Sequence, residues 1–139
     1  MIILDTNVLS ELAKQPPDTN VLRWIAAQDP DEMFVTSIAL AEMLSGIAVL
    51  PVGKRRALLQ QATERLFAEE FQDKVLVFDE DAAIAFAAIV AARKKRGRPV
   101  SEFDAMIAAI ARTHDAAVAT RDIKGFEHSG VEIINPWEA

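Results

Sequence analysis

Short apolar segments alternate with longer helical segments along the whole chain, and this alternation restricts the fold more than any other feature of the sequence. The apolar runs have the length and character of buried strands. They occupy residues 1–4, 33–36, 75–78, 117–119 and 131–134. The segments between them predict helices over 7–14, from 19, from 37, over 54–71, 79–96 and 101–114. This order is typical of an α/β domain with a mostly parallel sheet.

The length and composition are typical of one globular domain, which we expect to span residues 1–139. The chain has 51% hydrophobic and 26% charged residues, without an internal repeat or a linker-like tract. No apolar run is long enough to cross a bilayer, so no membrane association is expected. The first residues lack the basic start of a signal peptide, and we predict a cytoplasmic protein.

The residue types that are absent restrict the chemistry to oxygen and basic side chains. The chain has no cysteine and only two histidines, which excludes thiolate chemistry and histidine-rich metal sites. Its net charge of −6 also disfavours a binder that simply coats nucleic-acid phosphates with basic side chains. An enzyme that holds phosphates through bound cations remains compatible with that charge.

Four acidic residues are candidates for such a site. Asp5 and Asp122 each follow a predicted strand, and parallel strands place their carboxyl ends at one edge of a sheet. Glu42 is the only charged residue within 38–44, where an unpaired buried carboxylate would cost several kcal/mol. Asp104 has a competing explanation, because Ser101 to Asp104 resembles a capping box at a helix start.

A cluster of these acids would be poorly tolerated unless protons or cations neutralised its charge. Two carboxylates about 4 Å apart repel each other by roughly 4 kcal/mol at an effective dielectric constant near 20. Ligands that are all carboxylate oxygens select hard ions such as Mg²⁺ or Mn²⁺. The sequence alone leaves open whether the four acids meet.

Motifs in four separate places resemble one known family. The matching segments are Ile3-Leu4-Asp5-Thr6-Asn7, Ala41-Glu42, Phe103-Asp104-Ala105-Met106-Ile107-Ala108-Ala109, Ala119-Thr120-Arg121-Asp122 and Val131-Glu132-Ile133-Ile134-Asn135-Pro136-Trp137. The chain is similar over its whole length to PIN-domain proteins. It most resembles the toxin ribonucleases of VapBC-type toxin–antitoxin pairs and their FitB-like branch.

This resemblance implies a three-layer α/β/α sandwich and an Mg²⁺- or Mn²⁺-dependent endoribonuclease. By the family's motifs, the catalytic and metal-binding acids are Asp5, Glu42, Asp104 and Asp122. Hydrogen bonds from Thr6, Asn7 and Thr120 would support them. Many relatives have Asn before the fourth acid, where this chain has Arg121.

The resemblance also implies partners. A cognate VapB-type antitoxin would wrap the toxin and obstruct its pocket, and toxin homodimers are usual in the family. Operator DNA would be bound only indirectly, through the antitoxin, while RNA would be the substrate.

Several alternatives remain open from the sequence. The basic residues Arg93, Lys94, Lys95, Arg96 and Arg98 are candidate RNA contacts, but cations near a helix end are also explained by the helix dipole. A catalytically silent PIN-like module that acts through an antitoxin and operator DNA is the main functional alternative. A small Mg²⁺-dependent phosphatase or receiver-like domain is a weaker one.

Overall fold

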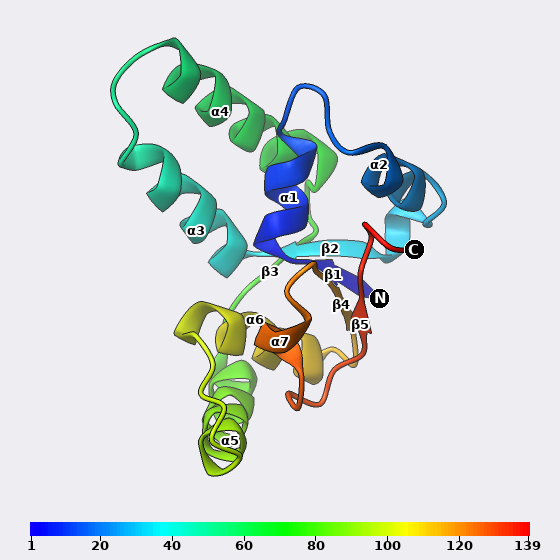
Figure 1. Cartoon of the computed structure of the whole chain (residues 1–139), viewed down its shortest axis with the longest axis vertical. Helices are drawn as coiled ribbons and strands as arrows, with labels where there is room; N and C mark the ends of the chain where they lie inside the picture. The colour runs from blue at the N-terminus through cyan, green and yellow to red at the C-terminus, as the bar shows by residue number, and fades with distance from the viewer.

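Five short parallel strands form the centre of the molecule (Figure 1). The computed structural model describes all 139 residues. The strands run in the order β3-β2-β1-β4-β5, and every neighbouring pair is parallel. Their bounds are β1 Ile2–Leu4, β2 Met33–Thr36, β3 Val75–Leu76, β4 Ala117–Ala119 and β5 Ile133–Ile134.

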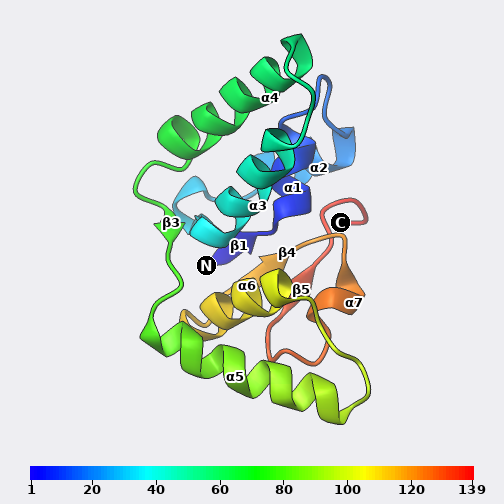
Figure 2. The same cartoon turned by 90° about the vertical axis from the view of Figure 1, so that its left-hand side faces the viewer.

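Helices cover both faces of this sheet, as the two views in Figure 1 and Figure 2 show. Helices α1 to α4 lie on one side, and α5 and α6 lie on the other with the short α7 beside them. Their bounds are α1 Thr6–Leu12, α2 Thr19–Ala26, α3 Ser37–Ala48, α4 Lys54–Arg65, α5 Glu80–Lys95, α6 Glu102–Thr113 and α7 Ile123–Phe126. The predicted three-layer α/β/α fold is confirmed.

Consecutive residues of the central strands point into different cores. In β1, Ile3 belongs to the apolar core beneath α5 and α6, while Leu4 belongs to the core beneath α1 to α4. In β4, Val118 and Ala119 divide in the same way. All four side chains are fully buried. Period-two alternation between two buried faces explains why these strands are apolar throughout.

The direction of winding reverses at β1. The chain adds β2 and β3 on one side of β1, and then crosses to add β4 and β5 on the other. In open α/β sheets, ligands bind outside the carboxyl ends of the strands at such a switch point. The residues that follow β1 and β4 therefore occupy the position that is favoured for a site.

The structure corrects several predicted boundaries. The third and fifth strands cover two residues each, and Val77 is 60% exposed because it lies beyond the end of β3. The helix predicted over 54–71 changes to a π-helical turn, η2, at Leu66–Glu70. Leu58 of this helix is 55% exposed. The 3-10 turn η1 at Pro30–Glu32 and helix α7 were not predicted, because four residues or fewer carry little periodicity.

None of the helices combines the length and the hydropathy that a bilayer crossing requires.

Candidate active site

An acidic cleft of about 430 Å³ opens at the carboxyl ends of β1 and β4. All four predicted acids line it, and each comes from a different part of the chain. Asp5 follows β1, Glu42 lies in α3, Asp104 lies in α6 and Asp122 precedes α7. The full set of lining residues is Asp5, Thr6, Asn7, Ser10, Glu11, Lys14, Glu42, Asp104, Arg121, Asp122 and Trp137.

Asp5 is the most deeply buried of these acids, with 4% of its surface exposed. Its backbone N–H donates to the carbonyl of Ala119 at 2.9 Å, which continues the pairing of β1 with β4. Its Oδ2 accepts a hydrogen bond from Thr120 Oγ1 at 2.8 Å, whereas its buried Oδ1 has no hydrogen-bond partner. Burial raises the pKa of Asp5 to about 7; the hydrogen bond from Thr120 opposes the rise, and the charges of Asp104 and Glu42 add to it.

Thr120 connects Asp5 to the other residues at this edge of the sheet. Its hydroxyl oxygen accepts hydrogen bonds from Asn7 Nδ2 and from the backbone N–H of Asp122, both at 3.0 Å. The backbone N–H of Arg121 donates to Asn7 Oδ1 at 3.3 Å. One hydroxyl group therefore joins the ends of β1 and β4 and the start of α7.

Glu42 is half-buried and is held by the residue that follows Asp5. Thr6 Oγ1 donates to Glu42 Oε1 at 2.8 Å, which ties the first turn of α1 to α3. Helix α3 itself begins at a side-chain cap, because Thr36 Oγ1 accepts from the N–H of Ala39 at 3.0 Å. The isolated charge in this apolar helix is thus paired with a hydroxyl donor at the cleft.

Asp104 combines the two roles that its sequence context suggests. Its backbone N–H donates to Ser101 Oγ at 3.2 Å, so Ser101 caps α6 as predicted. Its carboxylate also lines the acidic cleft. Burial raises the pKa of Asp104 to about 6, with further contributions from the charges of Asp122 and Glu42.

Gly125 lies against two of the acids. Asp122 caps α7 by accepting a hydrogen bond from the N–H of Gly125 at 3.0 Å. A Cβ atom on Gly125 would lie only 2.4 Å from Asp122 Oδ2 and 2.7 Å from Asp104 Oδ2. The absence of a side chain at this position leaves room for both carboxylates.

The donor set fits a hard divalent cation. No group of three or more of these side chains is arranged as a ready set of metal ligands. Mg²⁺ usually keeps several water molecules and binds through only one or two protein carboxylates. The unpartnered Asp5 Oδ1 and the raised pKa values of Asp5 and Asp104 both indicate that the protein alone stabilises these carboxylate charges poorly. A bound cation would stabilise them.

Arg93 requires a correction to the predicted RNA contacts. It is 4% exposed, and its guanidinium donates to the carbonyls of Arg98 at 2.8 Å, Lys124 at 3.0 Å and Glu127. It therefore fastens α7 to the end of α5 and does not present its charge to solvent. The other basic residues of this stretch, Lys94, Lys95, Arg96 and Arg98, are exposed.

Some of the cleft residues were missed by the sequence argument. Ser10, Glu11 and Lys14 lie three, four and seven positions after Asn7, so helical spacing would have placed them on one face with it. Trp137, which also lines the cleft, and Gly125, which packs against two of its acids, come from the C-terminal region, and no local pattern connects them with the acids.

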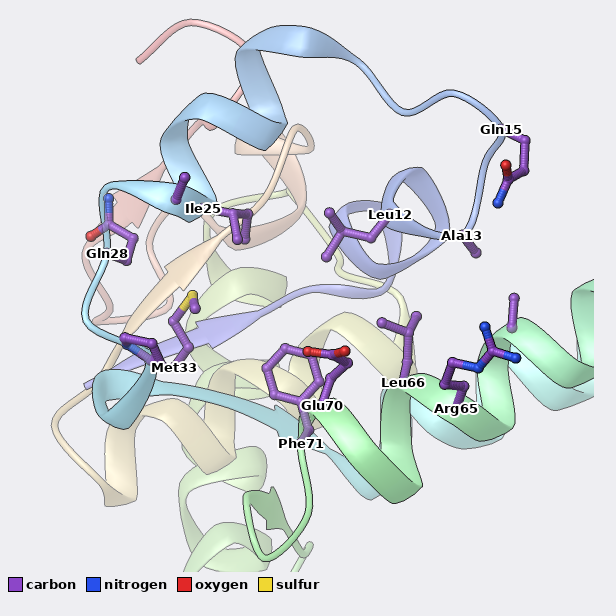
Figure 3. A pocket seen from close by; sticks show the side chains of 13 residues that line it. Leu12, Ala13, Gln15, Ile25, Gln28, Met33, Arg65, Leu66, Glu70 and Phe71 are labelled. Atoms are coloured by element: carbon purple, nitrogen blue, oxygen red, sulfur yellow. The ribbon is translucent and has the colours of Figure 1, made fainter.

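A second hollow of about 520 Å³ lies between α1, α2 and the segment from α4 to η2 (Figure 3). Leu12, Ile25 and Phe71 are among the side chains around it, and Glu70 is its only acid. With a single carboxylate and mainly apolar walls, it does not provide the ligands for hydrolytic chemistry. The acidic cleft is therefore the candidate active site.

Comparison with known proteins agrees with this geometry. The family model described as the PIN domain matches residues 2–130. The VapC ribonuclease Y4jK of Sinorhizobium fredii is 44% identical, with 99% of each chain covered. Toxin FitB of Neisseria gonorrhoeae is 35% identical over 99% of each chain. The structure of FitAB bound to a DNA fragment superposes with a TM-score of 0.90 at 35% identity, covering 100% of this chain and 97% of that one. The chain therefore belongs to the PIN-domain family, in the group that contains the VapC and FitB proteins.

Proposed function

We propose that this protein is an Mg²⁺- or Mn²⁺-dependent endoribonuclease and the toxin of a type II toxin–antitoxin pair. The observation that carries the proposal is the convergence of four acids, from four separate elements, on one cleft at the switch point of the sheet. The 44% identity to a protein named VapC ribonuclease supports the reaction class.

Asp5, Glu42, Asp104 and Asp122 are the residues that would hold the cation. When bound, the cation supplies an activated water and stabilises the charge that develops on the phosphodiester. Thr120 and Thr6 each donate to one carboxylate oxygen, at Asp5 Oδ2 and Glu42 Oε1, and so fix the orientation of these acids. Asp5 Oδ1 and the second carboxylate oxygen of Glu42 accept no hydrogen bond from the protein, and these oxygens would be available to the cation.

The reaction consistent with this site is hydrolysis of an RNA phosphodiester bond. The oxygen of water forms a bond to phosphorus, the bond between phosphorus and the 3′ oxygen breaks, and the 3′ oxygen takes up a proton. The products are a 5′-phosphate and a 3′-hydroxyl. Because no cysteine is present and neither histidine lines the cleft, no covalent intermediate on those residue types is part of the proposal.

The proposed regulatory partner is a cognate antitoxin of the VapB type. The relative FitB is named a toxin, and a FitAB structure with bound DNA superposes on this chain. We therefore propose that operator DNA is reached through the antitoxin. A toxin homodimer is a further part of this proposal, and light scattering of the purified chain with and without antitoxin tests it.

The deciding experiment is cleavage of end-labelled total RNA and tRNA in Mg²⁺, Mn²⁺ or EDTA, with the antitoxin absent. Asp5→Asn is the test variant, and Asp73→Asn, in an exposed turn outside the cleft, is the matched control. Fragments that require metal and are missing only with Asp5→Asn support the ribonuclease. Intact RNA in every lane favours the catalytically silent module.

A further inference from the structure

Arg121 and Trp137 form a cation–π pair on the wall of the acidic cleft. The central guanidinium carbon of Arg121 lies 4.7 Å from the centroid of the Trp137 ring, within the range of a cation–π contact. Both residues line the cleft, and Trp137 is its only hydrophobic lining residue. Neither residue belongs to the group that would hold the cation.

Each member of the pair is held in place by hydrogen bonds. The backbone N–H of Arg121 donates to Asn7, and Asn7 in turn donates to Thr120, the partner of Asp5. The backbone N–H of Trp137 donates to Asn135 Oδ1 at 3.0 Å, and its carbonyl accepts from Asn20 at 3.2 Å. A continuous chain of hydrogen bonds thus sets the position of Arg121 relative to Asp5.

Arg121 is also the cation in the cleft that is free to meet a substrate. The only other basic lining residue, Lys14, forms an ion pair with Glu11 at 3.0 Å. Arg121 is exposed and forms no ion pair. Trp137, the other member of the pair, packs against the core beneath α1 to α4. The pair is therefore backed by the protein and open toward solvent at Arg121.

We propose that the Arg121 guanidinium, supported by the Trp137 indole, is a stacking platform for one base of a single-stranded RNA. Unpaired RNA bases are commonly stacked on aromatic rings and on arginine guanidinium planes. The platform would hold the nucleotide beside the phosphate that lies at the acids. This inference rests on the proposed ribonuclease function and adds to it the residues that grip the substrate.

The test compares two labelled ribo-oligonucleotides of equal length, one intact and one in which the bases are replaced by abasic sites. Their binding is measured by anisotropy in Mg²⁺ with Asp5→Asn protein, in which cleavage is blocked. We expect the intact strand to bind about 10-fold more tightly, because stacking on one side chain contributes on that scale.

Arg121→Lys in the same background separates stacking from charge. Lysine keeps the positive charge but lacks the planar guanidinium. The preference for the intact strand should fall to nearly one with Arg121→Lys, while binding of the abasic strand should change little. Arg23→Lys is the matched control, since Arg23 is an exposed residue of α2 outside the cleft, and it should keep the preference.

A fluorescence measurement gives an independent readout. Trp24 and Trp137 are the only two tryptophans, so Trp24→Phe leaves the indole of the platform as the sole tryptophan emitter. The intact strand should change the emission of Trp137, and the abasic strand should not.

Equal binding of the two strands, an unchanged preference with Arg121→Lys, or no RNA binding at all would overturn the platform. The proposed function is tested separately, by measuring metal-dependent cleavage by the unmodified chain. Metal-dependent cleavage together with equal binding of the two strands would overturn the platform and support the ribonuclease. Tighter binding of the intact strand without any cleavage would support the platform and contradict the ribonuclease.

Discussion

Thr120 donates a hydrogen bond to Asp5 at 2.8 Å, although the two residues are 115 positions apart in the chain. They are the first residues after two adjacent strands, β4 and β1, and both are buried. The contact fixes one oxygen of the most buried acid and leaves the other without a protein partner. The orientation of Asp5 therefore depends on a neutral hydroxyl group, which adds no charge to the cleft.

Thr120→Val removes this hydroxyl while keeping the shape of the side chain. Asp5 loses a donor, and Asn7 and the N–H of Asp122 lose an acceptor, so we expect the free energy of unfolding to fall by about 1–3 kcal/mol. Urea denaturation measures the change. Thr113→Val at the end of α6 removes the hydroxyl of an exposed residue, which donates only to the carbonyl of Ile110 in its own helix, and should change stability by less than about 0.5 kcal/mol. Equal losses in both variants would contradict the role of Thr120.

Asp5→Asn should leave the metal-free protein as stable as the unmodified chain or more stable, because the variant removes a buried charge beside other acids. Saturating Mg²⁺ should stabilise the unmodified chain, by about 2.7 kcal/mol at 100 times the Kd, and should stabilise the variant much less. Thermal unfolding with EDTA or Mg²⁺ measures both effects. A variant that is clearly less stable in EDTA would show that Asp5 does not carry a repulsive charge.

The metal-free protein should become less stable as the pH rises. The pKa values of Asp5 and Asp104 are raised from 3.8 to about 7 and about 6, so the folded protein binds more protons than the unfolded chain between these limits. The free energy of unfolding without metal should therefore fall as the pH rises from about 4 to about 7, and these groups should contribute no further change above that range. The difference between the unmodified chain and Asp5→Asn in urea denaturation isolates the contribution of Asp5.

Metal binding should show the opposite trend over the same pH range. A cation binds the charged carboxylates and competes with protons, so the Kd for Mn²⁺ should decrease as the pH rises and level off above about 7. Calorimetric titration at several pH values measures it. A Kd independent of pH would show that neither Asp5 nor Asp104 binds the metal.

Gly125→Ala should weaken metal binding without a comparable loss of stability. The new Cβ would overlap the positions of Asp122 Oδ2 and Asp104 Oδ2, so both carboxylates must move. We expect the Kd for Mn²⁺ to rise by about 10-fold or more, a change of about 1.4 kcal/mol. Gly46→Ala is the control, because its Cβ meets nothing within 4 Å in the last turn of α3, where alanine should be neutral or stabilising. Unchanged metal binding by Gly125→Ala would show that Asp122 and Asp104 do not bind the metal.

Arg93→Met should destabilise the protein by about 2–4 kcal/mol, because the carbonyl groups of Arg98, Lys124 and Glu127 lose their buried donor. The neighbouring exposed Lys94 provides the control variant Lys94→Met, with an expected change below about 0.5 kcal/mol. Urea denaturation compares the two. If both variants are equally stable, the contacts of Arg93 contribute little to holding α7.

The placement of Asp5 and Asp122 was predictable because it follows from strand ends in a parallel sheet. The cap formed by Ser101 was predictable from four consecutive residues. These are local patterns whose geometric consequences are general.

The contacts of Gly125, Trp137 and Arg93 were not predictable, since each depends on how the C-terminal region packs. Helix α7 is four residues long, and its start at Asp122 looks like an ordinary turn in the sequence. Arg93 lies in a run of exposed basic residues, and only the packing of α7 onto α5 buries it. Side-chain roles that arise from such packing leave no periodic signal.

If the chain is the proposed ribonuclease, the pairing of β4 with β1 also determines when a newly synthesised chain gains a complete active site. During synthesis from the N-terminus, Asp5 and Glu42 emerge early, but β1 keeps an open edge until residues 117–119 have left the ribosome. Asp122 emerges only after these residues, so the fourth acid joins the others after β4 has been made. Before β4 pairs with β1, a nascent chain of the proposed ribonuclease would lack a complete acidic cleft, and an antitoxin would have that interval in which to be ready.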